Sequence, residues 1–150
     1  MIVLLDKRDS LSWSLMPAVM DRVRQFCEEF GTDGNPELLV DSIRKHFVAD
    51  IPLMLTVAAV EEGKVVGHAV ASIDTFLNKR YLTIMQLCID KKYRSKVFSK
   101  DMGGWKKMLE WGKNNGAHEV QVLTSSKSRS RLFKQCFGLR EHRILMRGDL

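Results

Sequence analysis

The sequence is poor in residues that build covalent or metal cross-links. It contains three cysteines and four histidines, and none of them has the CxxC or Cys/His spacing that metal sites use. Cys27, Cys88 and Cys136 lie far apart in apolar surroundings, which is typical of reduced thiols in a core. A chain of 150 residues can bury a sufficient core without such links. The composition therefore predicts neither a metal site nor a disulfide framework.

Long apolar runs are also missing. No stretch approaches the roughly 18 apolar residues that a membrane helix needs, and the chain has no internal repeat, low-complexity tract or linker. The opening "MIVLLDKRD" has five residues before its first charge, so it predicts a strand rather than a secretory signal. We therefore expect one globular domain over residues 1–150, in the cytoplasm and without a membrane partner.

Positive charge is scarce in the first half of the chain and abundant in the second. Residues 1–75 carry 7 Lys/Arg and 12 Asp/Glu, and residues 76–150 carry 17 and 6, so the halves have formal charges of −5 and +11. This asymmetry suits an anionic partner, either a polyphosphate-bearing cofactor or nucleic acid, and a solvated basic surface also explains it.

Two amphipathic helices are predicted after the first strand, residues 2–6. The first ends near Gly31, and the second begins with Asn35 as its cap and Pro36 at its first position. The apolar positions at helical spacing are Leu15, Val19, Val23 and Phe26 in the first helix, and Leu38, Leu39, Ile43 and Phe47 in the second.

The pattern then changes to β-rich runs. Two antiparallel strands within residues 53–76 are joined by "EEGK", whose Gly63 can adopt a positive φ in a tight turn. "NKR", residues 78–80, makes the next turn. Residues 81–90 form a third strand that is apolar at nearly every position, which is typical of a strand buried on both faces.

A crossover helix and further elements complete the predicted order. The helix is capped by Ser99 and ends at Asn115 and Gly116. The inner side of this helix comprises Met102, Trp105, Met108, Leu109 and Gly112. After the helix we expect a strand (residues 118–125), a short helix (128–138) and a last strand (139–148). The order is β-α-α-β-β-β-α-β-α-β, an α/β domain whose mixed, mostly antiparallel sheet is flanked by helices.

The stretch "LCIDKKYRSKVFS", residues 87–99, resembles a motif of the GCN5-related N-acetyltransferase (GNAT) family. The family pattern L-x-V-x-P-x-Y-R-G-x-G-I-G aligns without a gap, and Leu87, Ile89, Tyr93 and Arg94 keep the residue type. "LFKQCFGL" stands where the family has F-Y-x-x-x-G-F. Chain length and strand order agree with the family over the whole chain.

The resemblance implies a coenzyme A site built mainly from backbone. Amides at the start of the crossover helix bind the pyrophosphate, with charge added by Arg94, Lys96 and Lys100. The pantetheine arm lies between the splayed fourth and fifth strands and bonds main-chain groups of Leu87, Cys88 and Ile89, where an N–H stabilises the oxyanion. The implied activity is acetyl transfer from acetyl-CoA to a small-molecule or protein amine, by direct attack in a ternary complex without a metal.

The loop departs from the family pattern where glycines are expected. Ser95, Val97 and Ser99 replace them, and Phe98 replaces an aliphatic residue. The β-branched valine restricts the backbone and adds bulk at the pyrophosphate position, whereas Ser99 can cap the helix and bond a phosphate oxygen. The pair Gly103 and Gly104, one turn later, either admits something close to the helix or is a packing concession to Trp105. The departures leave an alternative open: an inactive GNAT-fold binding or structural module, as among small phage-encoded proteins including virion proteins, with a protein partner or a second copy.

Candidates for proton transfer are few. The alignment puts Lys134 where the family has a tyrosine that acts as the general acid. Lys134 could protonate the thiolate, add charge near a phosphate or face water. Gln86 is the polar side chain of the fourth strand, and His68, Asp74 or a water chain could receive the amine proton. An acyl-enzyme at Cys88 is not expected, because that thiol lacks cationic neighbours.

Two further interpretations concern partners. Acidic residues of the first half could attract a cationic amine, or they form ordinary solvated helix faces; they are Glu28, Glu29, Asp33, Glu37 and Asp41. The basic segments "KKYRSK" and "KSRSR" lack a recognition-helix, RNP or zinc pattern, so the sequence does not favour nucleic acid as a partner.

Overall fold

Five strands lie side by side in chain order. The computed structural model describes residues 1–30, 34–94, 102–122, 131, 133–135 and 138–140. The sheet has the order β1-β2-β3-β4-β5, in which β1 to β4 pair antiparallel and β5 pairs parallel with β4. The bounds are β1 Ile2–Leu4, β2 Met54–Glu61, β3 Lys64–Phe76, β4 Lys79–Ile89 and β5 Glu119–Val122. The predicted mixed, mostly antiparallel sheet is confirmed.

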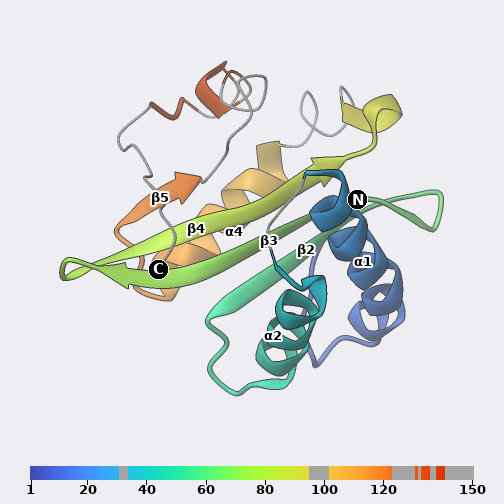
Figure 1. Cartoon of the computed structure of the whole chain (residues 1–150), viewed down its shortest axis with the longest axis horizontal. Coiled ribbons are helices and arrows are strands. Elements are labelled where there is room, and N and C mark those ends of the chain that lie inside the picture. Colours follow the sequence, from blue (N-terminus) through green and yellow to red (C-terminus); the bar gives the residue numbers. More distant parts are fainter. Residues whose placement is uncertain (31–33, 95–101, 123–130, 132, 136–137, 141–150) are drawn as a thin grey trace.

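Three helices cover the two faces of this sheet. Helices α1 (Ser10–Glu29) and α2 (Pro36–Val48) lie on one face, and α4 (Met102–Asn114) lies behind the other, as Figure 1 shows. A short 3-10 helix, Lys91–Tyr93, follows β4. Residues 131 and 133–135 are helical, as predicted, whereas most of the predicted last strand lies outside the described residues. The chain is thus an α/β domain of three layers.

Alternating side chains of the strands fill two cores. Val3, Ala58 and Val70 join α1 and α2 in one core, whereas Leu82 and Ile84 of β4 join α4 in the other. A strand sends successive side chains to opposite faces, so β1 to β4 each supply both cores. This explains why β4 reads as an almost continuous apolar run.

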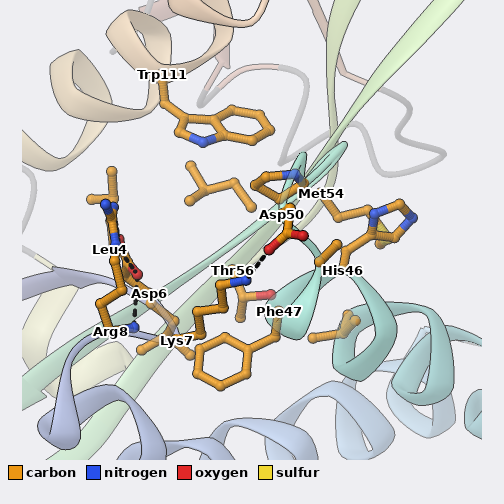
Figure 2. A pocket seen from close by; sticks show the side chains of 15 residues that line it. Leu4, Asp6, Lys7, Arg8, His46, Phe47, Asp50, Met54, Thr56 and Trp111 are labelled. Carbon is orange, nitrogen blue, oxygen red and sulfur yellow. Dashed lines mark hydrogen bonds and ion pairs between the residues drawn. The ribbon is translucent and has the colours of Figure 1, made fainter.

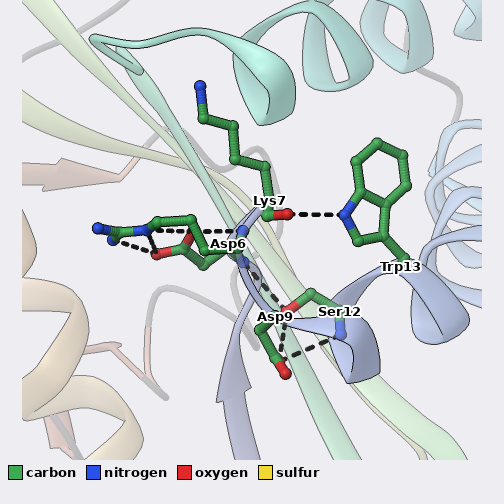
Figure 3. Close-up of polar contacts among 6 residues, drawn as sticks. Asp6, Lys7, Asp9, Ser12 and Trp13 are labelled. Atoms are coloured by element: carbon green, nitrogen blue, oxygen red, sulfur yellow. Dashed lines mark hydrogen bonds and ion pairs between the residues drawn. The ribbon is translucent and has the colours of Figure 1, made fainter.

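The start of α1 is fixed by a dense set of hydrogen bonds (Figure 3). Asp9 caps the helix by accepting from Leu11 N and Ser12 N at 3.2 Å each. Ser12 Oγ also donates to Asp9 at 2.9 Å and accepts from Asp6 N at 3.1 Å. The four predicted apolar positions of α1 are all buried. The preceding strand ends at Leu4, two residues earlier than predicted, because the chain turns here towards the helix.

Helix α2 begins as predicted, but one of its predicted core positions is wrong. Asn35 Oδ1 accepts from Glu37 N at 3.0 Å, and Pro36 occupies the first position. Leu38 is 69% exposed, whereas Val40 and Ile43 are fully buried. The helix meets the sheet along the line of Val40, Ile43 and Phe47, and Leu38 lies off that line.

Both hairpins use two-residue turns of positive φ. Glu62 and Gly63 have φ values of 52° and 75°, which confirms the turn predicted at Gly63. The next turn is Leu77 and Asn78, with φ values of 47° and 64°. The prediction of a turn at residues 78–80 is therefore wrong, since Lys79 and Arg80 already pair with Phe76 and Thr75.

The glycines of α4 serve packing against the sheet. A Cβ on Gly112 would lie 2.8 Å from Leu82 Cδ2, so glycine allows the helix to approach β4 closely. A Cβ on Gly104 would lie 3.0 Å from Ile2 Cγ2 of β1. Ile2 is thus a close neighbour that the sequence does not predict, and the two roles suggested for Gly104 stay predictions. The helix ends before Gly116, with φ of 85°, while its predicted cap Ser99 lies outside the described residues.

Candidate active site at the end of strand β4

A bulge at Met85 divides β4 into two parts. Ile84 pairs with Ala71 and Gln86 pairs with Val70, so Met85 is an extra residue opposite β3. On the other side, β5 pairs with β4 from Tyr81 to Ile84. Beyond the bulge, no strand among the described residues pairs with β4 on its β5 side. The family resemblance predicts a splayed strand at this position.

The main-chain groups beyond the bulge can be assigned to a side. Asp90 N donates to Val66 O on the β3 side at 2.8 Å. Because N–H and C=O groups alternate sides along a strand, those of Gln86 and Cys88 also face β3. Those of Leu87 and Ile89 then face away from β3, and Arg94 Nε donates to Ile89 O there at 2.9 Å. Of the three predicted pantetheine contacts, only Leu87 and Ile89 present main-chain groups to the β5 side.

The side chain of Gln86 is buried on the α1 side of the sheet. Its exposed fraction is 4%. Its Oε1 lies 2.8 Å from His68 Nε2, and its Nε2 donates to Cys27 Sγ at 3.3 Å. Cys88, the register partner of His68, is half-buried with a free thiol. The structure thus joins Gln86 to His68, two residues that the sequence analysis named separately.

A half-buried ion pair anchors the end of β4 to α1. Arg22 Nη2 donates to Asp90 Oδ1 at 2.7 Å and lies 3.3 Å from Val66 O. Sequence reasoning missed this pair and Cys27, because the partners are 68 and 59 positions apart and have no local signature. The remaining predicted loop residues, Ser95, Lys96, Val97, Phe98, Ser99 and Lys100, lie outside the described residues.

The other candidates for proton transfer lie on exposed positions. Asp74 is exposed at the far part of β3, where its Oδ2 accepts from Ser72 Oγ at 3.0 Å. Lys134 is exposed beside the buried Phe133. Their roles as base and acid stay predictions.

Part of the acidic surface suggested for a cationic amine is already paired within the chain. Arg24 donates to both carboxylate oxygens of Glu37, and this hydrogen bonding lowers the pKa of the Glu37 carboxyl. Asp41 lies 3.9 Å from Arg44. These partners weaken the attraction of the α1–α2 surface for an external amine.

A cavity of about 380 Å³ lies elsewhere, at the β1 edge of the sheet (Figure 2). Phe47 of α2 and Trp111 of α4 contribute to its lining. Lys7 Nζ lies in this cavity, where it donates to Asp50 Oδ1 at 2.7 Å and to Val48 O at 3.1 Å. The cavity contains none of the site residues predicted from the sequence, and β2 and β3 separate it from β4.

Both carboxylates that line this cavity, Asp6 and Asp50, accept hydrogen bonds from neighbouring cationic side chains. Arg8 donates to both oxygens of Asp6, and these hydrogen bonds lower the pKa of the Asp6 carboxyl to about 2. The hydrogen bond from Lys7 likewise lowers the pKa of Asp50. Each carboxylate therefore stays ionised and paired at neutral pH.

Two features are missing from the described part of the chain. No helix there has the length and apolar character needed to cross a membrane. No group of three or more His, Cys, Asp or Glu side chains there could hold a metal ion.

Comparisons with known proteins place this arrangement in a family. Among solved structures, the aminoglycoside acetyltransferase AAC(6')-Iy with a CoA-acetylneamine bisubstrate analogue has 17% identity and a TM-score of 0.70, with 100% of this chain and 97% of that chain covered. A Trypanosoma brucei acetyltransferase has 16% identity and a TM-score of 0.65, with coverages of 100% and 99%. A soil-metagenome aminoglycoside acetyltransferase with sisomicin has 18% identity and a TM-score of 0.60, with coverages of 100% and 95%.

These similarities establish the fold, and the sequence establishes the family. A comparison with curated protein sequences found no match. The model of the "Acetyltransferase (GNAT) family" matches residues 17–139, which include β4, its bulge and α4. The chain therefore belongs to the GNAT acetyltransferase family.

Proposed function

We propose that the protein is an N-acetyltransferase that transfers an acetyl group from acetyl-CoA to an amine. One observation carries this proposal: beyond the Met85 bulge, Leu87 and Ile89 direct their main-chain groups away from β3. A pantetheine arm has amide donors and acceptors of its own, so it can pair with such a strand as a peptide would. Family membership supports the same donor.

The residues at the end of β4 could each contact a particular part of acetyl-CoA. Leu87 N–H would bond the thioester or pantetheine oxygen, and Arg94 would lie beside the phosphate-bearing part of the molecule. The loop residues 95–100 would complete the phosphate contacts through backbone amides. Val97 is the position most opposed to this fit, because a branched side chain replaces the family glycine.

Transfer follows in one ternary complex. The amine nitrogen attacks the thioester carbonyl, a C–N bond forms, and the oxygen gains negative charge that Leu87 N–H stabilises. The C–S bond then breaks, and the CoA thiolate takes a proton for which Lys134 is the proposed donor. A water molecule would take the proton that the amine loses, because Asp74 pairs with Tyr81 at the other end of β4 from Leu87. No acyl-enzyme is required.

The acceptor that we propose is a small cationic amine. Asp74 offers an exposed carboxylate on β3, the strand next to β4, where it pairs with Tyr81. Aminoglycoside acetyltransferases are among the structures of similar fold, one with a bisubstrate analogue derived from acetylneamine and one with sisomicin. A protein amine is the second candidate acceptor.

Calorimetry with acetyl-CoA and with CoA tests the proposal. We expect micromolar affinity for both and, with an amine panel of aminoglycosides, polyamines and basic peptides, thiol release that depends on the amine. No heat at millimolar ligand would overturn the proposal in favour of an inactive module, the reading that the missing glycines support. In that case, binding gained by Val97→Gly would identify the side chain that closes the site.

A further inference from the structure

Helix α1 is attached to the back of the candidate site at two points. At the first point, Gln86 Nε2 donates to Cys27 Sγ at 3.3 Å. At the second point, Arg22 Nη2 donates to Asp90 Oδ1 at 2.7 Å. The segment between these points holds Leu87 and Ile89, whose main-chain groups face away from β3. Both attachments thus flank the part of β4 that pairs only with β3 among the described residues.

The first attachment continues through Gln86 to β3. We call Cys27, Gln86 and His68 the Cys27–Gln86–His68 bridge, since it joins α1, β4 and β3. With the amide Nε2 donating to sulfur, the amide Oε1 accepts from His68 Nε2 at 2.8 Å, which therefore carries the proton. The His68 ring also meets Phe26 of α1 edge-on, with 6.0 Å between the ring centroids. Both ends of the Gln86 amide are thereby engaged.

This arrangement makes Gln86 unsuitable for contact with a substrate. The side chain is 4% exposed and lies on the α1 face, whereas the Leu87 and Ile89 amides lie in the plane of the sheet. His68 is 3% exposed, and its Nε2 already donates to Gln86. Neither residue can take a proton from an amine through the groups that form the bridge.

A strand with one neighbour needs another restraint when its amides serve catalysis. In the paired half of β4, ladders on both sides fix the main chain. Oxyanion donors lose much of their effect when they move by about 1 Å. A buried hydrogen-bonded network can supply that rigidity, because breaking one of its bonds leaves a buried polar group unsatisfied.

We propose that the Cys27–Gln86–His68 bridge and the Arg22–Asp90 pair position the β4 main chain at Leu87–Ile89 for acetyl transfer. Gln86 and Arg22 are thus positioning residues and not catalytic ones, and α1 has a role in the reaction besides packing. This inference rests on the proposed function.

The main test replaces Gln86 by Met, which keeps the length of the side chain and removes both hydrogen bonds. We expect kcat to fall about 10- to 100-fold, while KM for acetyl-CoA changes less than about threefold. Cys27→Ala should lower kcat in the same way, and Cys27→Ser, which keeps an acceptor, should restore most of it. The double variant Q86M/C27A should be no slower than Q86M, because both act through one bridge.

A second readout does not depend on turnover. In Q86M, the ¹⁵N order parameters of Leu87 and Ile89 should fall from about 0.85 towards 0.6, while that of Leu82 stays unchanged. Arg22→Met tests the other attachment at a half-buried site where misfolding is not expected, and it should lower the order parameter of Ile89.

The outcomes separate the two proposals. Wild-type kcat and unchanged order parameters in Q86M would overturn the positioning role and leave the acetyltransferase proposal intact. Wild-type protein that neither binds CoA nor releases thiol would overturn the proposed function, while the order parameters would still decide whether the bridge fixes the strand. Additive losses in Q86M and C27A would show that the two residues act separately and would overturn the bridge.

Discussion

The two halves of β4 have the same secondary structure and different surroundings. Tyr81–Ile84 has β3 on one side and β5 on the other, and its side chains are buried. Gln86–Ile89 keeps β3 and has no second strand among the described residues. It has instead a buried hydrogen-bonded side chain and a half-buried ion pair to α1. The first half holds the sheet together, and the second half presents backbone.

A single residue separates the two halves. Met85 is inserted opposite β3, and the pairs on both sides of it remain in register. The insertion also places Met85 and Gln86 on the same face, so Gln86 meets α1 while Ile84 still meets α4. A bulge can therefore give one part of a buried strand different neighbours without altering the rest of the fold.

Deleting Met85 should have the largest effect, because it removes the difference between the halves. Ile84 and Gln86 already lie on opposite faces, so the shortened strand would alternate regularly and keep both registers. We expect cooperative folding by circular dichroism and a loss of CoA affinity of more than about 100-fold, or about 2.7 kcal/mol. Undiminished affinity in calorimetry would show that the bulge does not create the site.

Truncation of Ile84 should affect stability and spare the site. Ile84 is 1% exposed between β4 and α4, so Ile84→Ala should lower the free energy of unfolding by about 2–5 kcal/mol. Leu87→Ala, at a half-buried position on the same face, should cost less. Urea denaturation measures both values, and equal losses would contradict the distinction between the halves.

Two glycines allow close approach to opposite halves of β4. A Cβ on Gly67 would lie 2.9 Å from the Cys88 carbonyl oxygen, and one on Gly112 would lie 2.8 Å from a Leu82 side-chain carbon. Overpacking costs about 1–3 kcal/mol, and a backbone neighbour yields less easily than a side chain. Gly67→Ala should therefore destabilise more than Gly112→Ala and should also weaken CoA binding. Thermal melts and calorimetry of the two variants provide the comparison.

The smallest effect is expected far from β4, at Asp6. Its pKa is about 2, below the ordinary value of 3.8, because Arg8 donates hydrogen bonds to it. A lowered pKa stabilises the fold above pH 3.8, and the contribution disappears as the pH falls through 2. Asp6→Asn should therefore melt slightly lower than wild type at pH 6, with a difference that vanishes near pH 2. Since the pair is exposed, the difference should also shrink in salt. CoA affinity should not change.

Local sequence patterns predicted the helices, strands and turns better than they predicted the contacts between these elements. The sequence correctly predicted Asn35 as a helix cap, Gly63 as a turn residue and Gly116 as a helix end. Each of these roles depends only on the backbone of neighbouring residues. The sequence predicts Leu38 in the core because helical spacing allows several apolar stripes, and only contact with the sheet selects one of them. The turn at Leu77 was missed because leucine rarely adopts a positive φ.

The candidate site divides in the same way. The motif at residues 87–99 predicts cofactor contacts at Leu87, Ile89 and Arg94, since a continuous segment carries it, and these roles stay predictions. It could not separate Cys88 from its neighbours, because the side to which each main-chain group points depends on the β3 register.

The order of strands and helices, the hairpin at Gly63 and the family could be predicted from the amino-acid sequence, because they depend on residues close together in the chain or on a continuous motif. Three contacts could not be predicted in this way: the meeting of Cys27, His68 and Gln86, the ion pair of Arg22 with Asp90, and the close approach of Ile2 to Gly104. Those contacts join segments tens of residues apart, and their geometry depends on how α1, α4 and the sheet pack, which no local pattern contains.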